Sequence, residues 1–226
     1  MGQQHTEWIG VAPFLEEDLA FASIGQDELG HAALLFEVLV GSDDQAIDEL
    51  AFYREPDAWR SCHLTEMPLS DWADTLVRHW LYDAGEELRW QLFAESSLSA
   101  LRDVANRALQ EERFHRRHGD ALLDALLKVD DARARISPSL ASILPSALAM
   151  FDGVVEEAEA VAQGAIAAPF ASCLPAWRDR VDERFGAQDW STITTADGDR
   201  TTRHSDFGAL LARLREVFDL DRTAVW

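Results

Sequence analysis

The chain has 226 residues, of which 47% are hydrophobic and 27% charged, a composition typical of soluble globular proteins. Its 41 acidic residues outnumber its 20 basic residues, and the formal net charge of −21 excludes nucleic acid and anionic membranes as partners, because both require a basic surface. No stretch approaches the roughly 18 consecutive apolar residues of a membrane span, and the opening MGQQHTEW is not a signal peptide. We therefore expect a cytoplasmic protein. Cys62 and Cys173 are too far apart in sequence to indicate a metal motif or a disulfide framework.

Helical periodicity recurs along the chain. Between Pro13 and Val40 acidic residues fill the first turn, Gly41 closes the segment, and apolar residues recur at helical spacing at Leu15, Leu19, Ala22, Leu29, Ala33 and Phe36. Further helices are predicted at residues 43–53, 68–97, 98–127, 139–164 (with a break near Gly153), 171–185 and 205–218. Residues 54–67 and 186–202 are predicted to be irregular, and no alternating run indicates a strand. The sequence predicts an all-α protein, with residues 1–226 forming one domain around a bundle of long antiparallel helices.

Two of the predicted long helices carry a Glu-x-x-His motif. The motifs are Glu28–His31 and Glu112–His115. Residues three apart lie on one face of a helix, so each motif directs one carboxylate and one imidazole the same way. Two such motifs, completed by one carboxylate from each of two further helices, are typical of carboxylate-bridged di-iron or di-manganese centres.

The third carboxylate must come from the helix that pairs with the second motif. Asp83 stands 29 residues before Glu112, and the midpoint of that interval lies near the helix break at Ser97. In an antiparallel hairpin, residues equidistant from the turn stand at the same height. Asp83 satisfies this test, and Glu86 and Glu87, about one turn further along, satisfy it almost as well. Spacing alone leaves all three as candidates.

The fourth carboxylate must lie near Glu28. Glu16 and Glu17 are excluded, because they precede Glu28 by 11 or 12 residues on the same helix, about 16–18 Å at 1.5 Å per residue. Glu7, in a short helix before the break at residues 11–13, is the candidate that remains. Its spacing to Glu28 is asymmetric about that break.

A surface ion pair is the alternative interpretation of each motif. Glu111 and His115, for example, could form a solvated pair on a helix face, which stabilises a protein little. Glu28 and His31, however, lie in the segment SIGQDELGHAALLF among small and apolar residues, and a buried carboxylate requires a partner or a metal. His79 and His118 are expected beside the centre or on the surface, and no role is predicted for His5, His63 or His204.

The motifs resemble those of the family that contains the catalytic (A) and structural (C) subunits of the bacterial phenylacetyl-CoA epoxygenase. The resemblance covers nearly the whole chain. It rests on four segments, HTEWIGVAPFLEEDLAFASIGQDELGH, LVRHWLYDAGEELRWQLFAESS, ALQEERFHRRH and the C-terminal RHSDFGALLARLREVF. It implies a ferritin-like four-helix bundle with additional C-terminal helices. Only six residues precede Glu7, so we expect a first helix shorter than the family's.

The resemblance implies a complete set of metal ligands. Carried over residue by residue, the iron ligands of the family's catalytic subunit fall on Glu7, Glu28, His31, Asp83, Glu112 and His115. The resemblance thereby selects Asp83 over its two neighbours and supports Glu7. The frame of the chain is more similar to the structural subunit, which has lost ligands. Ile24 stands where the catalytic subunit has a lysine associated with the acyl-CoA.

The function implied is that of a non-haem di-iron oxygenase or oxidase. Two iron ions, with manganese as the alternative, would activate O2 for oxygen insertion into an organic substrate, an aryl- or acyl-CoA thioester by resemblance. Electrons would come from a separate reductase, and the chain would form a homodimer or a heterodimer with a related subunit. The first alternative is a non-catalytic structural subunit that pairs with a catalytic partner. The second is iron storage or peroxide detoxification of the ferritin type, which would need no substrate or reductase.

Overall fold

A computed structural model describes residues 1–69, 71–198 and 200–221. These ranges contain helices and no strand, which confirms the predicted all-α class. The helices are α1 (Gly2–Thr6), α2 (Leu15–Val40), α3 (Asp44–Asp48), the π-helical turn η1 (Glu49–Tyr53), the 3₁₀ turn η2 (Pro56–Ala58), α4 (His63–Glu66), α5 (Trp72–Ala94), α6 (Ser99–Leu126), α7 (Asp130–Ala149), α8 (Glu157–Ala162), the 3₁₀ turn η3 (Phe170–Cys173), α9 (Leu174–Phe185) and α10 (Phe207–Arg215). Within the described ranges, none of these helices is both long and apolar enough to cross a membrane.

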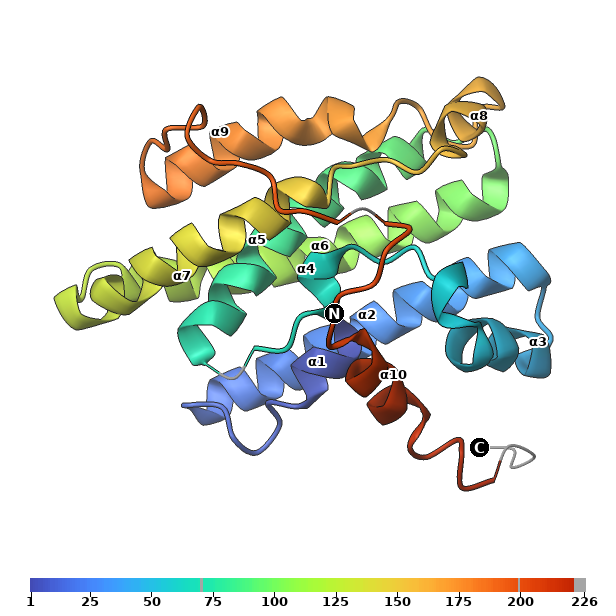
Figure 1. Ribbon diagram of the computed structural model, residues 1–226, viewed down its shortest axis with the longest axis horizontal. Coiled ribbons are helices and arrows are strands. Elements are labelled where there is room, and N and C mark those ends of the chain that lie inside the picture. The colour runs from blue at the N-terminus through green and yellow to red at the C-terminus, as the bar shows by residue number, and fades with distance from the viewer. Residues whose placement is uncertain (70, 199, 222–226) are drawn as a thin grey trace.

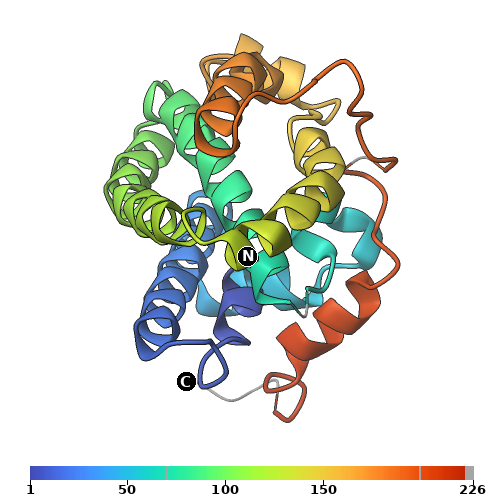
Figure 2. The ribbon, with the colours of Figure 1, turned by 90° about the vertical axis from the view of Figure 1, so that its left-hand side faces the viewer.

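The long helices α2, α5, α6 and α7 form a ferritin-like bundle, to which α8, α9 and α10 are added (Figure 1). Helix α5 is central, because it packs against α6, α7 and α9, and 13 of its 23 residues are buried. Helix α2 packs against α6, on the side of the bundle away from α9 (Figure 2). The turn between α5 and α6 is fixed by Ser97, whose backbone N–H donates to the carbonyl of Gly164 at 2.8 Å.

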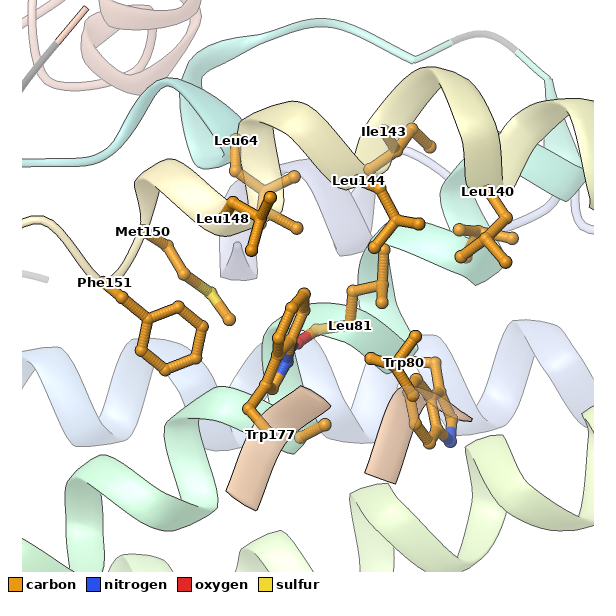
Figure 3. Packing of buried hydrophobic residues seen from close by; sticks show 14 of the residues in the cluster. Leu64, Trp80, Leu81, Leu140, Ile143, Leu144, Leu148, Met150, Phe151 and Trp177 are labelled. Carbon is orange, nitrogen blue, oxygen red and sulfur yellow. Dashed lines mark hydrogen bonds between the residues drawn. The ribbon is translucent and has the colours of Figure 1, made fainter. Parts of the chain in front are cut away.

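The main hydrophobic core lies between α5, α7 and α9 (Figure 3). Trp177 of α9 is fully buried, and its indole N–H donates to the carbonyl of Leu81 at 2.9 Å. The ring therefore packs in the core without leaving its N–H group unpaired. Gly85 lets the chain after α7 approach α5 closely, because a Cβ at this position would lie 2.3 Å from the methyl carbon of Met150. The core therefore occupies one side of α5 and leaves the opposite side to α2 and α6.

Helix α2 presents its regularly spaced leucines to the outside. Leu15, Leu19 and Leu29 are 68%, 64% and 47% exposed. The buried residues of the helix include Phe21 and Ile24 but also the polar side chains Glu17 and His31. The leucines of the stripe that predicts the helix therefore lie on its outer face, while the inner face carries both apolar and polar side chains.

The helix predicted over residues 139–164 begins earlier than expected, whereas its break near Gly153 is confirmed. Helix α7 begins at Asp130 and ends at Ala149, so it contains Pro138 and Pro145. A proline inside a helix removes one backbone hydrogen bond and so weakens the helix. Burial of Ile136 in the main core stabilises the turns before Pro138 and offsets this loss. After Ala149, three turn hydrogen bonds lead into an irregular segment, and only the short α8 follows. The segment 54–67, predicted to be irregular, also includes the short helices η2 and α4.

Shortening a leucine is expected to cost more stability in the main core than on the exposed face of α2. We predict that Leu81→Ala, which removes a fully buried side chain from the main core, lowers the free energy of unfolding by about 3 kcal/mol. The matched change Leu19→Ala, on the exposed face of α2, is expected to change it by less than about 0.5 kcal/mol. Urea unfolding followed by circular dichroism measures both values. Equal losses for the two leucines would contradict this assignment of core and surface.

Candidate metal centre

Helices α2, α5 and α6 direct carboxylates and imidazoles into one buried region. One atom each of Glu28, Glu112 and His115 lie within 4.8 Å of one another, an arrangement that could hold a metal ion. Glu112 and His115 are fully buried, and Glu28 is half-buried. The i,i+3 spacing of the motif on α6 places the last two on one face of that helix. Of the six predicted ligands, Glu28, Glu112 and His115 therefore form the closest group.

The carboxylate of Glu112 lies between two imidazoles. Its Oε2 is 3.5 Å from Nδ1 of His115, and its Oε1 is 3.9 Å from Nδ1 of His31. The two Glu-x-x-His motifs thus face each other across one carboxylate. Glu112, His31 and His115 are residue types that would hold bound cations in such a centre.

Asp83 approaches the same region from α5. Its side chain is buried, and its Oδ2 lies 3.1 Å from Nδ1 of His79. The alternatives left open by spacing are paired elsewhere, because Glu86 forms an ion pair with Arg89, and Glu87 forms one with Arg180.

Glu7 is not brought into this group. It follows the last residue of α1 and is half-exposed, and its Oε1 lies 2.8 Å from Nε of Arg213 in α10. Glu7 therefore has a basic partner at the surface, in contrast to the other five predicted ligands.

Two carboxylates that the sequence analysis did not assign hold the imidazoles. Oδ2 of Asp27 lies 3.2 Å from Nε2 of His115, and Oε2 of Glu111 lies 2.7 Å from Nε2 of His31. With a proton on Nε2, each imidazole donates to its carboxylate and leaves Nδ1 as an acceptor toward the centre, as histidine ligands of metals commonly do.

The arrangement of these carboxylates is reciprocal. Each acid directly precedes the glutamate of one motif and bonds the histidine of the other. The signal was present in the sequence as the pairs Asp27–Glu28 and Glu111–Glu112. The cross-pairing between motifs becomes apparent only when α2 and α6 are packed together.

The polar atoms at the centre have no protein partners that would satisfy them. Both oxygens of Asp83, both oxygens of Glu112 and Nδ1 of His115 are buried and form no hydrogen bond of proper geometry among the described residues. Burying such groups without partners costs several kcal/mol each. Hard oxygen donors combined with imidazole nitrogen suit iron or manganese. The residues present therefore fit a bound metal.

Comparison with known proteins places the chain in a family. The family model described as phenylacetic acid catabolic protein matches residues 1–226. The chain belongs to this family. It is also similar to the C subunit of 1,2-phenylacetyl-CoA epoxidase from Escherichia coli (strain K12), with 35% identity over 129 residues. That match covers 56% of this chain and 51% of the relative, so the chain spans about half the length of the curated relative it matches.

Three further histidines of this family member lie beside the centre, around Phe21. The ring centroid of Phe21 is 4.9 Å from that of His5, 5.2 Å from that of His79 and 6.3 Å from that of His118. Nε2 of His118 also lies 3.0 Å from Oε2 of Glu17.

His5 was assigned no role from its place near the N-terminus, yet it is fully buried, and burial followed by the charge of His79 lowers its pKa well below the usual value. Sequence spacing held no signal for this position. The reason for its burial is the close packing of α1 on α2 at Gly25, where an added Cβ would lie 3.2 Å from Thr6.

Burial and neighbouring charges together set the protonation of Glu112 and His115. It raises the pKa of Glu112 to about 8, with the negative charges of Asp83 and Glu28 acting in the same direction and the contact with His115 opposing them. Burial alone would lower the pKa of His115, but its contact with Glu112 and the surrounding carboxylates raise it to about 10. Without a metal, the centre therefore retains protons at neutral pH.

This retention makes the stability of the metal-free protein depend on pH. The folded protein keeps a proton on Glu112 between about pH 5 and pH 8, whereas the unfolded chain has released it, so this carboxyl costs more stability as pH rises through that interval. We predict that Glu112→Gln, which cannot ionise, becomes more stable relative to wild type by at least about 1 kcal/mol between pH 5 and pH 8. Urea unfolding in the presence of EDTA measures the difference.

Glu16→Gln, at an exposed position on α2, is the matched control and is expected to show no such trend. A constant difference between wild type and Glu112→Gln across this pH range would contradict the proposed burial of an ionisable carboxylate.

Proposed function

We propose that the chain binds two iron ions, with manganese as the alternative, through Glu28, His31, Asp83, Glu112 and His115. The observation that carries this proposal is the buried carboxylate of Glu112, which has no hydrogen-bond partner. Its Oε2 faces Nδ1 of His115, and its Oε1 faces Nδ1 of His31. Glu7 stays a predicted sixth ligand. It would reach the centre only by leaving Arg213.

The proposed activity is oxygen insertion into an organic substrate. Bound reduced iron would supply the activation of O2, and a separate reductase would supply the electrons. The substrate class, an aryl- or acyl-CoA thioester, is supported by the family and by the similarity to a subunit of an epoxidase named for phenylacetyl-CoA. The match covers about half of that relative.

The residues of this chain have separate tasks in this proposal. Asp27 and Glu111 fix the ring orientation of the two histidines and keep Nδ1 directed at the centre. Trp90 packs edge-to-face against His31, with 5.4 Å between ring centroids, and is itself buried. Ile24 is fully buried on the inner face of α2. As a buried apolar neighbour of His31, Trp90 limits access of water to this ligand.

A structural subunit that pairs with a catalytic partner is the second candidate function. Two observations favour it: the curated relative is the C subunit of its epoxidase, and Glu7 is bound to Arg213 rather than directed at the centre. In either function we propose that the chain associates with a related subunit or with a second copy. The exposed leucines of α2 support this association, because large exposed apolar residues gathered on one helix face are typical of protein interfaces.

Metal loading distinguishes the two functions. We predict that anaerobic incubation with ferrous iron loads about two iron ions per chain and raises the thermal midpoint, because a ligand at 100 times its dissociation constant stabilises a protein by about 2.7 kcal/mol. Glu28→Ala and His115→Ala are each expected to lose both the bound iron and the stabilisation. Metal analysis, visible absorption after exposure to air and thermal unfolding measure the three effects.

Glu16→Ala on the exposed face of α2 and His204→Ala outside the centre are the matched controls, and both should load iron as wild type does. If the wild type held no stoichiometric metal while both centre variants stayed folded, the enzyme assignment would fail and the structural subunit would remain.

A further inference from the structure

A second polar site lies on the side of α6 that faces away from α2. A hollow of about 520 Å³ is bordered by Glu87 of α5 and by six residues of α6, which are Arg113, Arg116, Arg117, Asp120, Ala121 and Asp124. Its residues do not include any of the predicted metal ligands. Three of the seven are arginines, although basic residues are scarce in this chain, which has 20 of them against 41 acidic residues.

The acidic residues of this hollow are paired with arginines from another helix. Glu87 lies 2.8 Å from Arg180 of α9, and Asp120 lies 2.9 Å from Arg184. Asp124 also forms an ion pair with Arg184. The carboxylates are therefore neutralised from the α9 side.

The arginines of α6 are left without close acidic partners. Arg116 is 3.8 Å from Glu87 and 3.9 Å from Asp120, the outer limit of an ion pair, and its Nη1 is buried without a hydrogen-bond partner. Arg113 and Arg117 are exposed, and neither forms an ion pair with any residue that the structure describes. The hollow itself is bordered by three arginines and three carboxylates, and Arg180 and Arg184 of α9 pair with those carboxylates, so the arginines of α6 are not neutralised by close ion pairs.

The chemistry of the hollow selects a small, compact anion. Guanidinium groups bind phosphate in a bidentate manner. Arg113 and Arg117 are four residues apart on α6, about 6 Å along the helix axis, and so lie on one face with room for two neighbouring phosphates. An extended polyanion such as nucleic acid would be repelled by the negative charge of the rest of the surface.

We propose that the arginine hollow of α6, formed by Arg113, Arg116 and Arg117, binds the diphosphate group of a small phosphorylated ligand. Arg116 is held in place by its position over the ring of Trp80, 4.9 Å from the ring centroid. The two exposed arginines provide the adjustable contacts. The proposal does not depend on metal at the buried centre.

Calorimetric titration of the full chain with inorganic pyrophosphate tests this proposal. We expect one site per chain, an affinity that falls with increasing salt, and weaker binding of inorganic phosphate, which engages one arginine at a time. The double variant Arg113→Gln/Arg117→Gln is expected to weaken pyrophosphate binding at least tenfold, whereas Arg133→Gln, at an exposed position on α7, should leave it unchanged.

Each titration is repeated after removal of metal with EDTA, because pyrophosphate also binds iron. Binding that survives EDTA and is lost in the double variant supports the hollow as the site. Binding that disappears with EDTA, or that is the same in wild type and a folded double variant, would overturn the proposal. Equal affinity for phosphate and pyrophosphate would overturn the two-arginine arrangement.

Discussion

The buried carboxylate of Glu112 is the group on which the rest of the structure depends. It is fully buried, it accepts no hydrogen bond, and its nearest polar neighbours are Nδ1 atoms of His31 and His115. An isolated charge in this position would be too costly to keep. Burial and the negative charges of Asp83 and Glu28 raise its pKa to about 8, so a proton compensates for the charge in the metal-free protein. Bound cations would compensate for it in the proposed function, and metal binding would then release protons.

The fold separates this polar region from the apolar core by using the two sides of α5. One side carries Leu81 into the core with α7 and α9, and the other carries His79 and Asp83 toward α2 and α6. Helix α2 carries Glu17 and His31 beside apolar residues on its inner face, and it exposes several leucines on its outer face. Exposed leucines gathered on one helix face are typical of surfaces that another protein covers.

The sequence was sufficient for the features that depend on local spacing. The helical class, the long helices α2, α5 and α6, and the two Glu-x-x-His faces all follow from periodicities of three and four residues. It was insufficient where packing between distant segments decides. The start of α7 depends on burial of Ile136 despite Pro138, and the burial of His5 depends on how α1 packs against α2. The pairing of Asp27 with His115 joins residues 88 positions apart. Glu7, supported by resemblance, has Arg213 as its partner, a residue more than 200 positions away.

The most direct test of the central claim is a crystal structure of the full chain soaked anaerobically with ferrous iron, with data collected at the iron absorption edge. We predict two anomalous peaks per chain, one on each side of the Glu112 carboxylate and each near Nδ1 of one motif histidine. Peaks confined to surface carboxylates, or no peak beside Glu112 in a well-ordered chain, would contradict the proposed metal centre.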